Sequence, residues 1–238
     1  MKGFQQNCCL ICHAIIAPII GWRALFSAEK VQLLCPECEG KLEKISGDTC
    51  RICTRPFQNL AERFRHGDLC HDCHRWEEDK EWKGYLEKNI SIYLYNNFLK
   101  EVIARYKFRG DYLLAKIFAI PFKELVHNMK ADLLVPIPLS EERLYERGFN
   151  QASALLSEAG FQTTDILSRI HSEKQSKKSR SERIHIPQVF AVNPAVPLQN
   201  KKVVLVDDIY TTGSTLRHAA KLIIEAGAEN VRSLTIAR

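Results

Sequence analysis

Two adjacent carboxylates near the end of the chain are followed by a short run of small hydroxyl residues. Asp207 and Asp208 come directly after the apolar run 203–206, and apolar residues recur with helical spacing from Leu216 onward. This pattern predicts a strand, a tight loop and a helix. A helix N-terminus offers unpaired backbone N–H groups, and a glycine lets the backbone approach a ligand closely, so the loop is suited to hold a phosphate group. The loop consists of Thr211, Thr212, Gly213, Ser214 and Thr215.

The two acids extend what this segment can bind. They stand where the predicted strand ends, and ligands of open α/β sheets lie at that edge. Carboxylates there are suited to accept hydrogen bonds from sugar hydroxyls, so one segment could bind both ends of a ribose 5-phosphate. The alternative is an ordinary strand, turn and helix in which an acid caps the turn, but capping needs one acid and not two before a hydroxyl-rich loop.

The cysteines form a second group of residues with chemistry of their own. All nine lie within the first 73 residues, and eight of them form four C-x2-C pairs. Each such turn directs two sulfur atoms into one tetrahedral site, and two turns complete a closed structural zinc site. We expect two consecutive zinc ribbons, although an arrangement in which the first pair meets the third stays open. The pairs are Cys9 and Cys12, Cys35 and Cys38, Cys50 and Cys53, and Cys70 and Cys73.

Composition indicates a folded protein of the cytoplasm. Hydrophobic residues make up 45% of the 238 residues, which is usual for a globular chain. Neither an apolar run long enough to span a bilayer nor a signal-peptide pattern is evident, so we expect a soluble cytoplasmic protein without membrane insertion. In such a compartment paired cysteines favour metal over disulfides. Cys8 lies beside Cys9 and is expected to be a spare thiol.

Charge and pattern divide the chain near Gly84. Residues 1–83 carry as many basic as acidic residues, so the net charge of +6 belongs to residues 84–238. We therefore predict a double zinc-ribbon domain over 1–83 and an α/β domain over 84–238, joined by a linker that contains Trp76 and Trp82. The basic surplus fits phosphate-rich ligands, with solvated surface lysines as the alternative.

The elements of the second part can be placed from hydrophobic periodicity. Alternation from Ile90 predicts a strand, and Asn97 is expected to cap the helix that follows. That helix ends in a basic cluster around Lys107, which is either a partner of the helix dipole or part of a ligand site. A second helix over 111–126 contains Pro121, and the apolar run 133–138 predicts a buried strand that prolines terminate.

Two basic segments follow these elements. Arg143 and Arg147 fall one helical turn apart, which requires either a bound anion or neutralisation by Glu142 or Glu146. The stretch 168–185 is the most basic of the chain and lacks apolar periodicity, so we expect a mobile loop. Such a loop is either solvated, closes over the phosphate site, or contacts nucleic acid phosphates. Its candidate ligand residues are Lys174, Lys177, Lys178 and Arg180.

These motifs together resemble known families. The segment 203–215 resembles the 5-phosphoribosyl-1-pyrophosphate (PRPP) signature of type I phosphoribosyltransferases. Combined with Pro-Ile-Pro at 136–138, Arg-Gly-Phe-Asn-Gln at 147–151 and the four upstream cysteine pairs, the whole chain is similar to the ComF family of competence proteins. The resemblance implies a parallel α/β sheet of the type I phosphoribosyltransferase kind, flanked by helices and preceded by a small zinc-ribbon domain with four cysteine ligands per metal.

The same resemblance implies a function. The expected role is an accessory factor for DNA uptake in natural transformation, which binds PRPP with Mg²⁺, contacts single-stranded DNA and works with other DNA-uptake proteins. Residues 207–215 would hold the ribose phosphate, Arg143 and Arg147 the pyrophosphate, and the basic loop would close over them. The alternative is an active phosphoribosyltransferase with an unidentified acceptor base or amine, for which the sequence reveals neither a catalytic residue nor a residue that selects the acceptor.

Overall fold

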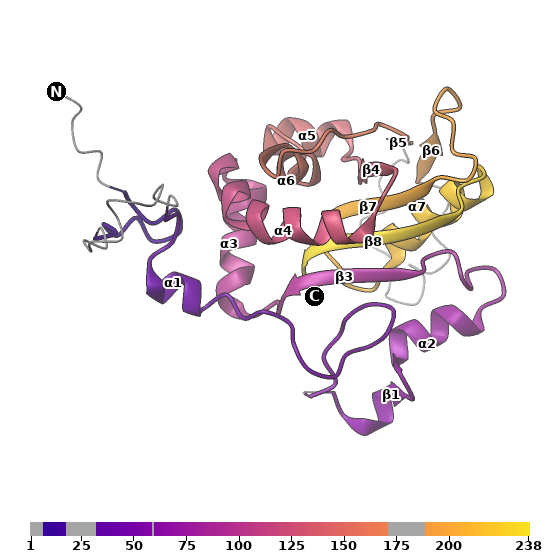
Figure 1. Ribbon diagram of the computed structural model, residues 1–238, viewed down its shortest axis with the longest axis horizontal. Helices are drawn as coiled ribbons and strands as arrows, with labels where there is room; N and C mark the ends of the chain where they lie inside the picture. Colours follow the sequence, from indigo (N-terminus) through magenta and orange to yellow (C-terminus); the bar gives the residue numbers. More distant parts are fainter. Residues whose placement is uncertain (1–6, 18–31, 59, 171–188) are drawn as a thin grey trace.

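A four-stranded parallel sheet forms the centre of the computed structural model, which describes residues 7–17, 32–58, 60–170 and 189–238 (Figure 1). The strand order is β3-β8-β7-β4, and every neighbouring pair is parallel. Parallel strands need crossover connections, and helices supply them. The predicted fold class is therefore confirmed. The strands are β3 (Lys88–Tyr93), β4 (Leu133–Pro136), β7 (Lys202–Ile209) and β8 (Asn230–Ala237).

Helices pack against both faces of this sheet. On β7, Val204 and Val206 point into the core formed with α3, α4 and α6, whereas Val203 and Leu205 point into the core formed with α7. This alternation is the two-residue period of a strand, and apolar side chains on both faces are typical of a parallel sheet covered on two sides. The helices are α3 (Asn97–Phe108), α4 (Ala115–Met129), α6 (Gln151–Glu158) and α7 (Ser214–Glu225).

Two details of the helices differ from the sequence-based expectation. Asn96, not Asn97, caps α3, because its side-chain oxygen accepts the backbone N–H of Leu99 at 2.8 Å. The helix α4 continues through Pro121 and is preceded by a short 3-10 turn, η3 (Tyr112–Leu114).

The cysteine-rich part consists of short elements. They are α1 (Pro36–Gly40), η2 (Glu62–Phe64), β1 (Arg65–His66), β2 (Leu69–Cys70) and α2 (His71–Glu78). The strands β1 and β2 form an antiparallel hairpin, and α2 begins at the residue after Cys70. The expected linker around Trp76 and Trp82 was wrong: Trp76 lies in α2, and both indoles are buried against each other.

The cysteine-rich part and the sheet share hydrogen bonds and cores. Asn89 donates its backbone N–H to Ile52, and Thr54 Oγ1 accepts the backbone N–H of Ser91 at 3.0 Å. Each of the two cores contains cysteine side chains beside residues of the sheet and its helices. The division at 83 and 84 stays a prediction, with these contacts as the features that join the two predicted domains.

Two further elements flank the site region. They are α5 (Glu141–Arg147) and the antiparallel pair of β5 (Leu167–Arg169) and β6 (Phe190–Val192). The predicted loop residues Lys174, Lys177, Lys178 and Arg180 lie between β5 and β6, outside the described residues. Within the described ranges, no helix combines the length and apolar character needed to cross a membrane.

Candidate functional site

The loop after β7 has the shape predicted from its sequence. Asp207 and Asp208 lie at the carboxyl end of β7, and α7 begins at Ser214. Gly213 caps α7 with a φ of +80°, and a Cβ at this position would collide with the Tyr210 hydroxyl. Both the left-handed backbone and the missing space require glycine here. The first turn of α7 therefore presents its backbone N–H groups beside the hydroxyl residues of the loop.

The two acids differ in their partners. Asp208 forms an ion pair with Lys107, whose Nζ lies 2.8 Å from Oδ1, while Asp207 accepts the backbone N–H of Asp208 at 2.8 Å. Burial and the charge of Asp208 raise the pKa of Asp207 to about 7, and Lys107 and Arg147 oppose this shift. The carboxyl of Asp207 therefore holds its proton to a higher pH than an ordinary aspartate, and a ligand that donates hydrogen bonds would favour its charged form.

Arginines gather around this acid pair. Burial lowers the pKa of Arg147, and the charges of Asp208 and Asp207 oppose that shift. Burial and the charge of Arg143 lower the pKa of Arg169, and Asp207 opposes the shift. Arg143 itself is exposed on α5. The charges of these residues act on one another, so the two predicted arginines of α5 and a third arginine from β5 lie in the same region as the acids of β7.

Two cations at this site were not selected from the sequence. Lys107 appeared only as one member of a basic helix end, and Arg169 only as part of the basic stretch. The signal that could have found Lys107 is its position near the end of the first crossover helix, together with an acid pair elsewhere that needs a counter-charge. The signal for Arg169 is its place at the end of a short strand, directly before the most basic segment.

The motif at 147–151 holds the predicted pyrophosphate arginine in place. Arg147 Nη1 donates to Gln151 Oε1 at 2.8 Å, and Tyr106 donates its hydroxyl to the backbone oxygen of Gln151 at 2.7 Å. Asn150 caps α6 and donates Nδ2 to the backbone oxygen of Ile137, in the proline-rich loop, at 2.9 Å. Asn150 and Gln151 therefore position the loop and Arg147.

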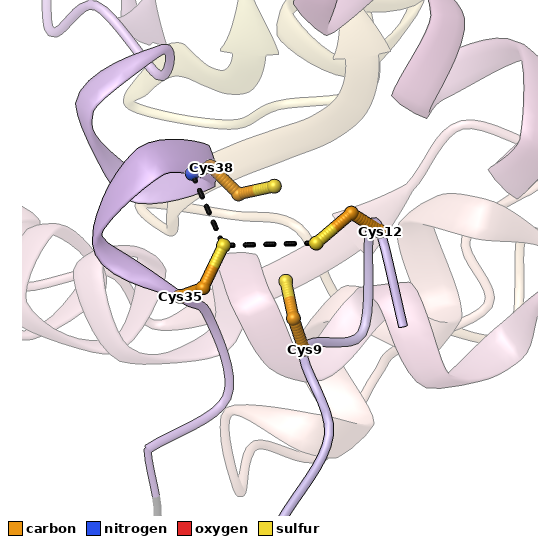
Figure 2. Close-up of side chains that lie close together, drawn as sticks. All are labelled: Cys9, Cys12, Cys35 and Cys38. Atoms are coloured by element: carbon orange, nitrogen blue, oxygen red, sulfur yellow. Dashed lines mark hydrogen bonds between the residues drawn. The ribbon is translucent and has the colours of Figure 1, made fainter. Parts of the chain in front are cut away.

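The first cysteine group comes from two separate turns. Figure 2 shows the four sulfur atoms of Cys9, Cys12, Cys35 and Cys38 directed toward one another. The Sγ atoms of Cys12 and Cys35 lie 3.6 Å apart, and the backbone N–H of Cys38 donates to Cys35 Sγ at 3.5 Å. Tetrahedral zinc with Zn–S bonds of about 2.3 Å places its sulfur ligands about 3.8 Å apart. The donor set and its spacing thus fit a structural metal ion.

The second group, Cys50, Cys53, Cys70 and Cys73, is buried throughout. Cys53 and Cys70 bring their Sγ atoms within 3.6 Å, and the backbone N–H of Cys70 donates to Cys50 Sγ at 3.3 Å. In both groups all ligand atoms lie within 4.8 Å of one another. The consecutive arrangement is therefore the one that forms, and the interleaved alternative is excluded. Exposed Cys8 belongs to neither group.

Known proteins show similarity along the whole chain. The model of the phosphoribosyl transferase domain matches residues 144–238. Competence protein ComFC of Bacillus subtilis is 37% identical over 242 residues, which cover 99% of this chain and 97% of the relative. Competence protein ComFC of Streptococcus pneumoniae is 35% identical over 231 residues, which cover 97% of this chain and 99% of the relative.

A more distant relative is the DNA utilization protein YhgH of Escherichia coli K12. It is 25% identical over 171 residues, which cover 64% of this chain and 72% of that protein. The two full-length matches agree with each other, and the matched phosphoribosyl transferase domain includes the loop after β7. This chain belongs to the ComFC family of competence proteins.

Proposed function

We propose that this protein is an accessory factor for DNA uptake in natural transformation, which binds PRPP and contacts single-stranded DNA. The names of the full-length relatives refer to competence, and that of a more distant one to DNA utilization, which supports the cellular role. One observation above all supports the proposed PRPP site. An acid pair, a glycine-capped helix N-terminus and several cations converge at the carboxyl end of β7.

Each part of this site has a role in PRPP binding. The loop 211–215 would bind the 5-phosphate through backbone N–H groups and hydroxyls, and Asp207 and Asp208 would accept the ribose hydroxyls. Arg143 and Arg147 would bind the pyrophosphate group, which carries Mg²⁺ with it. Lys107 already compensates the charge of Asp208 at 2.8 Å, so the site tolerates two adjacent acids before the ligand arrives.

Metal at the two cysteine groups is proposed to be Zn²⁺. Four thiolates form a closed set with no open position for a substrate, so the ion would act on the fold and not on chemistry. Because Cys9 and Cys38 of the first group and all four cysteines of the second group are parts of the cores, metal binding would stabilise the folded state directly.

A surface for unpaired nucleotides adjoins the phosphate site. Phe108 is 68% exposed at the end of α3, and the guanidinium of Arg147 lies 5.4 Å from the centre of its ring. Exposed Arg109, the residue that follows α3, and exposed Arg143 on α5 add positive charge. An exposed ring beside arginines provides base stacking and phosphate neutralisation, the two contributions to sequence-independent single-strand binding. Tyr93 and Tyr106 are buried, so they contribute to the core and not to stacking.

The PRPP site is tested by calorimetric titration with PRPP and Mg²⁺. Wild-type protein is expected to bind, and Asp207→Asn/Asp208→Asn to lose binding, because a neutral amide replaces each carboxyl group. Absence of binding by the wild type would refute the PRPP site. Addition of candidate bases and a pyrophosphate assay then separate the two roles: release of pyrophosphate would indicate a transferase, and its absence the accessory factor.

The single-strand surface is tested by titration with an oligonucleotide at several salt concentrations. Arg109→Ala/Arg143→Ala is expected to weaken binding and to reduce the salt slope by about 1.4, which is about 0.7 for each lost phosphate contact on a single strand. Phe108→Ala should weaken binding without a change in slope. Lys116→Ala/Lys123→Ala on the outer face of α4 removes the same charge elsewhere and serves as the control. Equal slopes for both double variants would place the DNA on another surface.

A further inference from the structure

The backbone carbonyl groups of residues 210–212, at the start of the phosphate-binding loop, accept hydrogen bonds from side chains outside the loop. Arg238 Nη1 donates to the oxygen of Tyr210 at 3.2 Å and to that of Thr211, and Trp76 Nε1 donates to the oxygen of Thr212 at 3.0 Å. In a planar trans peptide the C=O of one residue and the N–H of the next point in opposite directions. Carbonyls drawn toward Trp76 and Arg238 therefore turn the N–H groups of residues 211–213 toward the opposite side, where an anion would bind.

Both donors are anchored at the second cysteine group. Trp76 lies on α2, three residues after Cys73, and is buried. Arg238 Nη2 reaches Cys70 Sγ at 4.0 Å, and its guanidinium lies 4.8 Å from the centre of the Tyr210 ring. A metal ion that fixes the sulfur atoms of Cys70 and Cys73 would thus fix the two groups that orient the loop.

A second connection joins α2 to the first turn of α7. Arg217 is fully buried, and its Nη1 donates to Glu77 Oε1 at 2.8 Å. The same guanidinium lies 5.3 Å from the centre of the Trp76 ring, and the backbone N–H of Arg217 donates to the oxygen of Gly213. The helix that follows Cys70 is therefore held against both the loop and the helix that the loop begins.

We infer that the second cysteine group is a structural part of the phosphate-binding site, with Trp76 and Arg238 as positioning residues that hold the loop 210–213 in its anion-binding conformation. This rests on the proposed PRPP site. By linkage, metal in this group and an anion in the loop stabilise one another. The first group does not share this role: among the described residues its turn contacts α3, where Arg105 donates to the backbone oxygens of Leu10 and Ile11.

The first test removes one hydrogen bond and keeps the ring. Trp76→Phe deletes the N–H donor to Thr212 and is expected to raise the Kd for PRPP about fivefold, the equivalent of one hydrogen bond. Trp82→Phe is the matched control, because Trp82 is equally buried and its Nε1 has no hydrogen-bond partner among the described residues. The Trp82 variant should bind PRPP like the wild type. Equal affinities for the two variants would overturn the inference.

The second test needs no PRPP. Hydrogen–deuterium exchange of the segment 210–216 is compared in full-length wild type, Cys70→Ser and Cys12→Ser, with Trp76→Phe as the variant that keeps both metal groups. Faster exchange of this segment in Cys70→Ser and Trp76→Phe, with no change in Cys12→Ser, is expected. Unchanged exchange in Trp76→Phe would refute the inference. Altered exchange in these variants of a protein that fails to bind PRPP would refute only the proposed ligand.

Discussion

At the scale of single residues, Gly213 is the position of the site that is least able to accept a side chain. Its φ of +80° and the Tyr210 hydroxyl in the space of a Cβ both disfavour any side chain. Gly213→Ala is expected to lower stability by about 1–3 kcal/mol or more and to abolish PRPP binding. Gly160→Ala is the control, because its φ of +83° carries the same strain in open space. Urea titration that finds equal losses for both variants would contradict the close approach of Tyr210.

At Asp207, the ionised form that would bind the ligand is also the form that lowers the stability of the folded protein. Its raised pKa means that the folded protein binds this proton more tightly than the unfolded chain, so ionisation of Asp207 lowers stability as the pH rises. Asp207→Asn removes this cost. We expect the variant to gain about 1 kcal/mol above pH 7 after solvent screening, and the gain to shrink to zero as the pH falls toward about 4.

Thermal melts of wild type and Asp207→Asn between pH 4 and pH 8 measure this difference. Asp208→Asn is the comparison, because Asp208 forms an ion pair with Lys107 at 2.8 Å, and the substitution removes the ion-pair partner of this largely buried lysine. A gain for Asp207→Asn that stays constant over the whole range would show that Asp207 has an ordinary pKa.

At the scale of elements, α3 depends on a cap that the sequence pattern misplaced by one residue. Asn96 accepts the Leu99 N–H and also donates Nδ2 to the backbone oxygen of Lys41 and to Glu43 Oε1. Asn96→Ala is therefore expected to cost about 1–2 kcal/mol in unfolding free energy. The neighbouring Asn97 is exposed, and Asn97→Ala should change stability by less than about 0.5 kcal/mol. A larger loss of stability for Asn97→Ala than for Asn96→Ala in chemical denaturation would indicate that Asn97 is the cap.

Elements were predictable from the sequence where their causes are local. The run 203–215 contains its own strand alternation, glycine and helix start, and each C-x2-C turn brings two sulfurs together within four residues. The cap of α3 was ambiguous because two asparagines stand side by side, and either side chain can accept the N–H groups of the first turn. Only the backbone of the folded helix decides between them.

At the scale of the whole molecule, the contacts that complete the site join distant parts of the chain. Trp76 and Thr212 are 136 residues apart, and Arg238 and Cys70 are 168 residues apart. No periodicity or motif encodes such contacts, so an acidic segment with two tryptophans resembled a linker. The pairing of α2 with α7 depends on how the cysteine group packs against the sheet, and this arises only when the entire chain folds.

The second cysteine group is buried throughout, whereas the first is partly exposed. We therefore expect the loss of metal from the second group to lower stability more. Protein purified under reducing conditions is expected to hold two Zn²⁺ per chain by elemental analysis, and Cys12→Ser and Cys53→Ser to hold one each. Cys53 is fully buried with its three partners, whereas Cys12 is exposed. Cys53→Ser should therefore lower the Tm much more than Cys12→Ser, because it leaves a buried group without its metal. A metal content near zero in the wild type would refute both zinc sites. Equal Tm values for the two variants would contradict the larger contribution of the second group to stability.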